Sequence, residues 1–224
     1  MAAFERTEEV MDDDGPVPGL PELAELLEER DAELSAHGAR VAGYAERIAR
    51  VMGLPAPVIA RVRVAARLHD LGKVWIAKDI LDKPGPLSER EWGEIRRHPA
   101  VAAGVLRAGD FHDVAAIVAA HHERPDAAGY PDGIPSCDAP LEAQIVAVAD
   151  VYDAMLSRRP YAPARTPEEA REELERVAAT QLDENVVEAF LRVLDGPRQS
   201  TSAALPRPAA TAHDGYSRRY RPEQ

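Results

Sequence analysis

Apolar side chains recur every three to four residues along most of the chain, which is the spacing of one face of an α-helix. This spacing predicts helices over residues 22–52, 57–71, 111–122, 141–156, 166–179 and 183–194, with a short element over residues 79–81. Ser35 and Gly38 are candidate interruptions of the first helix. Ser88 with Glu91 three residues later is the capping-box pattern and predicts another helix start, and Pro99 opens a further helical turn.

Residues 125–140 contain four prolines and two glycines and are expected to form a loop. No stretch alternates apolar and polar residues in the manner of a strand, so the expected fold class is all-α, a helical bundle. We expect three parts. They are a disordered acidic lead-in over residues 1–21, one domain over residues 22–196, and a disordered tail with proline and arginine over residues 197–224.

The net charge of −12 comes from 27 basic and 39 acidic residues and is concentrated in residues 1–33, which hold twelve acids and two arginines. No basic face is found, so a nucleic-acid polymer is not an expected partner. Cys137 is the only cysteine, which excludes an intrachain disulfide and fits a reducing cytoplasm. The N-terminus lacks the apolar core of a signal peptide, and no apolar run approaches the roughly 18 residues of a membrane span. We therefore expect a cytoplasmic protein without a membrane partner.

Seven potential metal ligands lie on or beside the apolar helical stretches. They are His37, His69, Asp70, His98, His121, His122 and Asp150. Histidine and carboxylate hold iron, manganese or zinc, and ligands on several helices let packing fix the coordination geometry. The alternative is that each histidine is a surface residue or a hydrogen-bonded core residue. That alternative must hold at every one of these positions, including two adjacent pairs, so we favour a metal site.

Asp70 follows His69 at a predicted helix end, where its carboxylate can offer one oxygen to each of two cations. Lys73 lies three residues on, and a cationic donor beside paired metals suits a phosphate substrate. Taken alone, Lys73 would more often be a solvated lysine that the helix dipole favours. Glu33 would share a helix face with His37, four residues later, but it belongs to an acidic run and is equally well explained as a solvated residue.

Adjacent helical residues point about 100° apart, so His121 and His122 can both reach a metal centre only if the helix end is splayed or two metals lie side by side. Other residues have plainer interpretations. We expect Trp75 and Trp92 in the core, as large aromatic residues usually are. His112 is expected to be exposed in the first turn of a helix.

A series of short motifs runs in order through the chain: HDLGK at residues 69–73, KPGPL at 83–87, HP at 98–99, HHER at 121–124, GYP at 129–131, VADVYDAM at 148–155 and RPY at 159–161. Together they resemble the HD-GYP subclass of HD-domain phosphohydrolases, over roughly residues 31–194. The resemblance implies an all-α HD-domain bundle with two or three divalent metal ions in its core, iron first, with manganese and zinc as alternatives. It also implies hydrolysis of the bacterial second messenger cyclic di-GMP to pGpG, with GMP as a further product.

The resemblance assigns roles to the residues that match its motifs. The metal ligands it implies are His37, His69, Asp70, His98, His121, His122 and Asp150, with Glu33 at the place of a glutamate in members that hold a third metal. Asp70 and Lys73 would carry the catalysis, with Lys73 at the scissile phosphate. Gly129, Tyr130 and Pro131 would shape the loop beside the site, and Arg159 would bind a phosphate or a guanine edge.

The chain departs from the family in its substrate-binding part. Asp126-Ala127-Ala128 stands where the family usually has Asp-Gly-Ser, and losing the glycine is expected to stiffen the loop and exclude a positive φ. Ala162 stands where many active relatives carry a lysine or arginine, so a weaker grip on cyclic di-GMP is expected. Two alternatives stay open. One is a phosphohydrolase for another cyclic dinucleotide or nucleotide, and the other is a non-turnover adaptor that binds a diguanylate cyclase through the Gly-Tyr-Pro loop.

Overall fold

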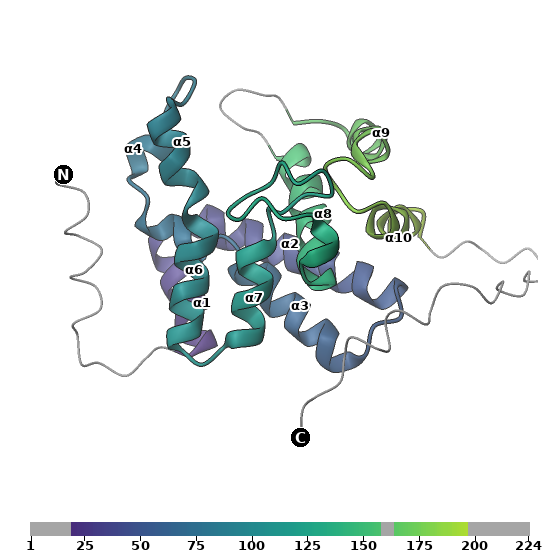
Figure 1. The fold of residues 1–224 in the computed structure, drawn as a ribbon, viewed down its shortest axis with the longest axis horizontal. Helices are drawn as coiled ribbons and strands as arrows, with labels where there is room; N and C mark the ends of the chain where they lie inside the picture. The colour runs from purple at the N-terminus through teal and green to yellow at the C-terminus, as the bar shows by residue number, and fades with distance from the viewer. Residues whose placement is uncertain (1–18, 158–163, 197–224) are drawn as a thin grey trace, which may run out of the picture.

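The computed structural model describes residues 19–157 and 164–196, and over these residues the chain is helical, as the apolar spacing predicts (Figure 1). The helices are α1 (Leu20–Arg30), α2 (Ala32–Val51), α3 (Ala56–Leu68), α4 (Lys78–Leu81), α5 (Glu89–Arg96), α6 (His98–Ala108), α7 (His112–Ala120), α8 (Leu141–Leu156), α9 (Pro167–Val177) and α10 (Glu184–Leu194), with short 3-10 helices η1 (Leu71–Trp75) and η2 (Ser136–Asp138). Within these ranges only isolated β-bridges occur and no strand. None of the described helices has both the length and the hydropathy needed to cross a bilayer.

The first predicted helix is divided at Asp31, and not at Ser35 or Gly38 as the sequence suggested. Asp31 has extended backbone, and its side chain accepts a backbone N–H from the first turn of α2 at 2.9 Å. Ser35 and Gly38 are buried inside α2. A Cβ on Gly38 would lie 2.5 Å from the backbone oxygen of Arg67, so only glycine lets α2 approach α3 this closely. This contact places His37, the neighbouring residue, beside the end of α3.

Helix α2 is the centre of the bundle and packs against α1, α3, α8 and α10. Helices α6 and α7 pack side by side, and α7 also contacts α3 and α8 (Figure 1). An edge-to-face cluster of three rings joins α2, α8 and α10, with centroids 4.8–5.7 Å apart: Tyr44, Tyr152 and Phe190. Together, the packing contacts of these helices fix the ends of α3 and α7 and the middle of α8 relative to one another.

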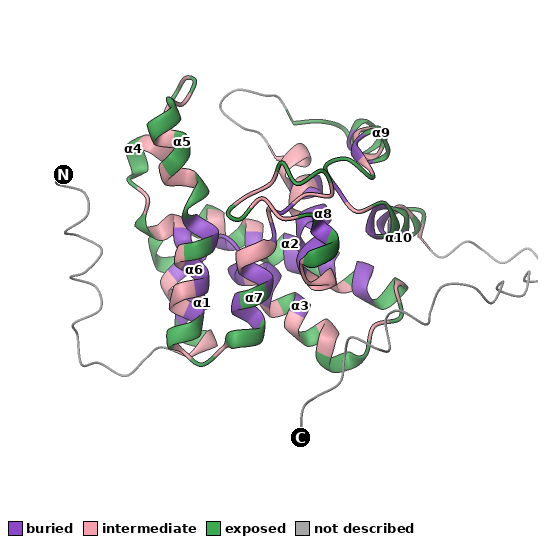
Figure 2. Ribbon diagram, viewed as in Figure 1, coloured by how far each residue is buried: buried purple, intermediate pink, exposed green. Residues whose placement is uncertain are grey.

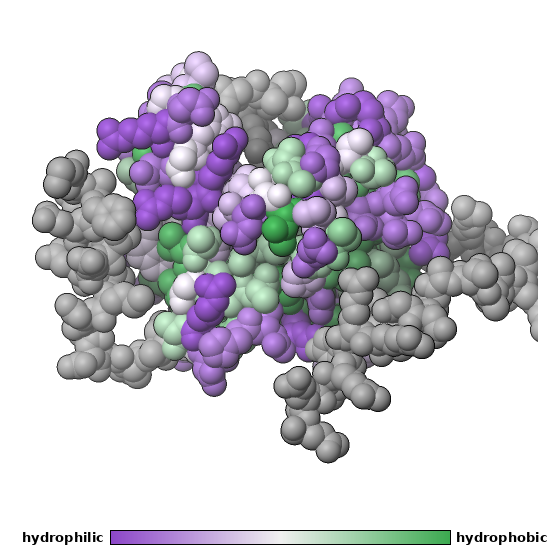
Figure 3. Space-filling model, in the orientation of Figure 1, coloured by the Kyte–Doolittle hydropathy of each residue, from purple (hydrophilic) through white to green (hydrophobic). Residues whose placement is uncertain are grey.

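Helix α5 stands off from the bundle and buries none of its own residues (Figures 1 and 2). Its start has the predicted capping box, in which the Ser88 side chain accepts the backbone N–H of Glu91 and the Glu91 carboxylate accepts that of Ser88. Trp92 on this helix is 43% exposed and Trp75 at the end of η1 is 37% exposed, so the expectation that both lie in the core was wrong. Trp92 has no core to enter, because α5 has no buried residue and packs mainly against α6. Figure 3 shows the hydrophilic surface that covers α5 and α9.

Candidate metal centre

Five helices bring the predicted ligands to one place in the bundle. They are His37 in α2, His69 and Asp70 directly after α3, His98 at the first residue of α6, His121 and His122 directly after α7, and Asp150 in α8. Two groups of three have ligand atoms within 4.8 Å of one another: His37, His69 and Asp70, and His98, His121 and His122. These are not scattered surface histidines, since residues more than a hundred positions apart in the sequence converge here.

The first group gains a second carboxylate from α8. His37 Nε2 lies 3.1 Å from Asp150 Oδ1 and 3.8 Å from Asp70 Oδ2. His69 Nε2 lies 3.3 Å from Asp70 Oδ2 and 3.8 Å from Asp150 Oδ1. We call this set, consisting of His37, His69, Asp150 and the Oδ2 atom of Asp70, the acidic half. Its two imidazole nitrogens and two carboxylate oxygens are a ligand set for one divalent ion.

The second group lies on the other side of Asp70. His98 Nε2 is 3.2 Å from Asp70 Oδ1 and 3.4 Å from His121 Nε2. The rings of His121 and His122 have centroids 4.0 Å apart, and both residues can face inward because α7 ends at Ala120, before the pair. We call His98, His121, His122 and the Oδ1 atom of Asp70 the histidine half. Asp70 therefore presents one oxygen to each half, as its place in the sequence suggested.

Three of the histidines are held in the same way. The Nδ1 atom of each donates to the backbone carbonyl three residues earlier, at 2.6–2.8 Å: His69 to Ala66, His98 to Ile95 and His121 to Val118. A carbonyl oxygen can only accept, so the proton of each neutral ring is on Nδ1 and its Nε2 carries a lone pair. Hydrogen bonds of this kind orient metal-ligating histidines and raise their basicity.

Several side-chain atoms of the centre that carry lone pairs face one another, and this arrangement shows whether a cation would fit between them. His98 Nε2, a lone-pair atom, points at Asp70 Oδ1 and at His121 Nε2, so acceptors meet acceptors. Asp70 Oδ1 and His69 Nε2 are buried and have no hydrogen-bond partner among the described residues. Buried polar atoms without a partner are costly, and a positive ion between them removes that cost. The residues present therefore fit divalent metal ions in both halves.

The pKa values in the acidic half are governed by its carboxylates. Burial alone would lower the pKa of His37, but hydrogen bonds to Asp150 and Asp153 outweigh burial and raise this pKa to about 9. Burial opposes the charged form of Asp70 as well, yet the charges of His69 and Lys73 hold the pKa of this carboxyl well below its usual range. The metal-free acidic half is thus a place where protons and cations compete.

The histidine half behaves in the opposite way. Burial and the neighbouring histidines hold the pKa of His121 well below its usual value. Burial, the larger cause, lowers the pKa of His122 to about 3. Both rings are therefore neutral at physiological pH, which is the form that binds metals.

Two residues that support His37 were not among the predicted site residues. Asp153 Oδ2 accepts a hydrogen bond from His37 Nδ1 at 2.7 Å, and the same carboxylate pairs with Arg40 at 2.8–2.9 Å. Asp153 lies in the predicted helix three residues after Asp150, so helical spacing to a ligand was the signal that could have identified it.

Lys73 and Glu33 are placed very differently. Lys73 Nζ lies 2.7 Å from Asp70 Oδ2 with a side chain 25% exposed, so it is tied to the centre and is not a freely solvated lysine. Glu33 is exposed in the first turn of α2 and belongs to neither group of ligands.

The Gly-Tyr-Pro loop lies against the histidine half. The Tyr130 ring centroid is 4.6 Å from that of His122 and 6.4 Å from that of His98. Tyr130 also donates its backbone N–H to the His122 carbonyl at 3.2 Å. A Cβ on Gly129 would lie 2.7 Å from the backbone nitrogen of Arg124, so glycine allows the loop to pack directly on the segment that carries His122.

The backbone of this loop has one anchor that sequence reasoning missed. The buried carboxylate of Glu123 accepts three backbone N–H groups, from Asp132, Gly133 and Ile134, at 2.8–3.2 Å. Ala127 in the same loop adopts φ 56°, so the expectation that losing the family's glycine excludes a positive φ was wrong. The alanine takes the left-handed conformation and bears its steric cost.

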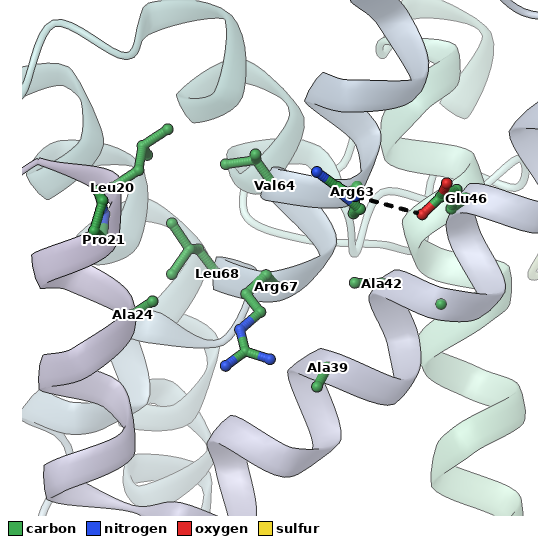
Figure 4. A pocket seen from close by; sticks show the side chains of 11 residues that line it. Leu20, Pro21, Ala24, Ala39, Ala42, Glu46, Arg63, Val64, Arg67 and Leu68 are labelled. Carbon is green, nitrogen blue, oxygen red and sulfur yellow. Dashed lines mark ion pairs between the residues drawn. The ribbon is translucent and has the colours of Figure 1, made fainter. Parts of the chain in front are cut away.

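Arg159, the remaining predicted substrate-binding residue, and Ala162 lie outside the described residues. A separate groove of about 460 Å³ opens among α1, α2 and α3 (Figure 4). Leu20, Ala24 and Leu68 contribute to its apolar wall, and its one lining carboxylate, Glu46, lies 3.9 Å from Arg63. None of the predicted ligands lines this groove, so it is not the candidate site.

Comparison with known proteins identifies the bundle and the motifs together. The HD domain family matches residues 21–186. The cyclic di-GMP phosphodiesterase response regulator RpfG of Xanthomonas campestris is 42% identical over 77% of this chain and 47% of its own length. A cyclic di-GMP phosphodiesterase of Thermotoga maritima is 39% identical (75% and 46%), and a 3'3'-cGAMP-specific phosphodiesterase of Vibrio cholerae is 36% identical (77% and 34%). The chain thus spans half or less of the length of these curated relatives.

Solved structures share the fold at lower identity. A cyclic GMP-AMP specific phosphodiesterase of V. cholerae superimposes with a TM-score of 0.61 at 18% identity, over 80% of this chain and 48% of that one. The HD domain of the phosphodiesterase PgpH of Listeria monocytogenes gives a TM-score of 0.55 at 18% identity, over 78% and 97%.

Proposed function

Because this chain belongs to the HD domain family and its relatives are HD-GYP phosphodiesterases, we propose that it hydrolyses a phosphodiester bond of cyclic di-GMP. The product is pGpG, with GMP as a further product. The observation that carries the proposal is the position of Asp70, which offers one oxygen to the acidic half and the other to the histidine half. A shared carboxylate is what two neighbouring metal ions need, and paired ions suit displacement at phosphorus.

The donor set indicates which ions the centre takes. Imidazole suits iron and zinc, whereas carboxylate oxygens suit manganese, so two divalent ions with iron first and manganese or zinc as alternatives fit both halves. A third ion would need Glu33 to turn toward His37. When bound, such ions supply an activated water and neutralise charge on the phosphate.

Side chains of the protein bind the substrate and stabilise its phosphate charge. Asp70 holds Lys73 Nζ at 2.7 Å, beside the place where a phosphate would meet the centre. From there the ammonium donates to a phosphate oxygen and stabilises the charge that develops in the transition state. Gly129, Tyr130 and Pro131 form the wall of the substrate site next to the histidine half. In this proposal Arg159 binds the second phosphate of the substrate.

A second cyclic dinucleotide is a specific rival substrate. Relatives of similar identity act on cyclic di-GMP or on 3'3'-cGAMP by name. Both substrates present the same phosphodiester to the centre and differ in one base. Ala162, at the place where many active relatives carry a cation, weakens the grip on the second phosphate and leaves more of the selection to contacts with the bases.

The test is anaerobic purification with metal analysis, followed by incubation with each cyclic dinucleotide and chromatographic detection of pGpG and GMP. We expect metal-dependent turnover of cyclic di-GMP that Asp70→Ala abolishes. The matched control is Asp113→Ala, because the Asp113 side chain is 75% exposed on α7. Turnover that survives Asp70→Ala would contradict the proposal. A protein without bound metal or turnover that binds a diguanylate cyclase would establish the adaptor function instead.

A further inference from the structure

Helix α5 presents an exposed aromatic ring and an exposed cation to solvent, although it contributes nothing to the core. Trp92 is 43% exposed, and Arg96 lies one turn later on the same helix. The Arg96 guanidinium carbon lies 5.8 Å from the centroid of the Trp92 ring. Aromatic side chains and arginine are enriched at binding surfaces, and a cation near the face of an indole ring is attracted to it.

The same guanidinium connects α5 to the metal centre. Its carbon also lies 5.9 Å from the centroid of the Tyr130 ring, and Tyr130 in turn lies against His122 with centroids 4.6 Å apart. Trp92, Arg96, Tyr130 and His122 thus form a chain of neighbouring planar groups, each next to the one before it. It runs from the histidine half to the surface of α5, and we call it the stacking ladder.

Arg96 is available for this role because no acid pairs with it among the residues that the structure describes. Its neighbour Arg97 is different, since the Arg97 side chain turns to Glu94 at 3.4 Å. The helix that carries the ladder is fixed at its start by the capping box and by Lys83, whose ammonium lies 2.6–2.8 Å from the Glu91 carboxylate. The start of the helix that carries Trp92 is therefore held by side-chain hydrogen bonds and an ion pair.

From this geometry we infer that the stacking ladder is a nucleobase-binding surface, on which one purine of the cyclic dinucleotide stacks against Trp92 while its phosphate lies at the metal centre. The inference rests on the proposed function and adds a contact to the base. Aromatic rings and guanidinium planes are the groups on which proteins stack unpaired bases. The positive charge of Arg96 also attracts the dianionic substrate to this side of the site.

The chain offers a direct spectroscopic test, because Trp75 and Trp92 are its two tryptophans. In a Trp75→Phe background, Trp92 is the sole source of indole fluorescence. Titration with a phosphorothioate analogue of cyclic di-GMP, which resists hydrolysis, should quench this fluorescence in a saturable way. The indole emission of the background protein should not change when inorganic phosphate is the titrant, because phosphate has no base to stack.

Kinetics of the full chain give the second readout. Trp92→Ala should raise KM for cyclic di-GMP about tenfold, within the range that base stacking contributes, and leave kcat within about twofold. Trp92→Phe should restore most of the affinity. Arg96→Ala should raise KM several-fold, while the matched control Arg97→Ala should leave it unchanged.

The outcomes separate this inference from the proposed function. A wild-type protein that hydrolyses cyclic di-GMP, with unchanged KM in Trp92→Ala and no quenching by the analogue, would overturn the inference alone. A loss of kcat and bound metal in Trp92→Ala that Trp92→Phe does not restore would also overturn it, in favour of a structural role. A wild-type protein that neither binds nor hydrolyses any cyclic dinucleotide would overturn both.

Discussion

The acidic half and the histidine half share Asp70 but are otherwise built on opposite principles. In the acidic half two carboxylates face two imidazoles, and hydrogen bonds to Asp150 and Asp153 outweigh burial and raise the pKa of His37 to about 9. The histidine half has three imidazoles and a single carboxylate oxygen, and burial lowers the pKa of His122 to about 3. One half therefore holds protons in the absence of metal, and the other does not.

Because of this difference, ions bound in the two halves would experience different surroundings. Carboxylate-rich sites tolerate hard ions such as manganese, whereas an imidazole-rich site prefers iron or zinc. We therefore expect mixed metal content when iron is scarce, with the histidine half more selective. Asp70 is the one residue that belongs to both halves, so a change at an ion in one half would reach the other half through it.

The largest expected effect comes from removing that shared ligand. Asp70→Asn should lower the metal content of both halves and reduce phosphodiesterase activity by more than about 100-fold, since even partners outside the ligand set contribute 10–100-fold. Metal analysis and product chromatography measure the two effects. Asp113→Asn should change neither. Loss of only one ion from Asp70→Asn would show that Asp70 does not bridge the halves.

A smaller effect should be confined to the acidic half. Asp153→Asn removes the carboxylate that holds His37 Nδ1 at 2.7 Å and should weaken metal binding there by roughly 10–100-fold. The histidine half should keep its affinity, which a chelator competition titration measures ion by ion. Asp195→Asn, on a surface aspartate that pairs with Arg171, is the control. An equal loss of metal affinity in both halves would show that Asp153 does not act on the acidic half alone.

The next effect is the pH dependence that the raised pKa of His37 gives to the acidic half. In the metal-free protein, the raised pKa of His37 contributes stability that is fully present below pH 6.5 and lost as the pH rises through about 9. Metal binding needs the neutral ring, so filling the acidic half below about pH 9 should release a proton, and affinity should rise with pH across that window. His121→Ala isolates this half for calorimetry at neutral pH in buffers of different ionisation enthalpy. If the heat of metal binding is the same in every buffer, no proton is released and the prediction is wrong.

The smallest effect concerns the loop beside the histidine half. Ala127 has φ 56°, a conformation that costs a residue with a Cβ roughly 1–2 kcal/mol, while glycine loses roughly 0.5–1 kcal/mol more chain entropy on folding. Ala127→Gly should therefore stabilise the protein by about 0.5–1 kcal/mol in urea unfolding and leave the metal content of both halves unchanged. Ala128→Gly, at a neighbouring position without a positive φ, should destabilise it. If both variants change the free energy of unfolding in the same direction, this explanation is wrong.

The sequence was most informative where a local pattern decides the structure. Helix α8 begins at Leu141 and ends at Leu156, as its apolar pattern predicts, because a helix buried on most sides needs no information from elsewhere. The seven predicted ligands other than Glu33 converge, because helical packing brings their apolar faces together. Trp92 could not be placed in this way, since its exposure depends on α5 standing away from the core.

What sequence reasoning missed depends on contacts between distant segments. Glu123 follows the histidine pair, but nothing in the spacing shows that its carboxylate is occupied by backbone N–H groups nine to eleven residues later. Gly38 looks like a helix breaker until the Arg67 backbone of α3 is known to lie against it. In both cases a tertiary contact, which no local pattern encodes, decides the role of the residue.

The carbonyl groups that hold His69, His98 and His121 have a consequence for how such a centre can change over evolutionary time. The residues that supply these carbonyls are Ala66, Ile95 and Val118, and only their main chain takes part. Their side chains are free to diverge with the surrounding core, provided that the helical turn survives. A designer could therefore transplant each histidine with one turn of helix, and the transplanted segment would carry its own orienting hydrogen bond into a new scaffold.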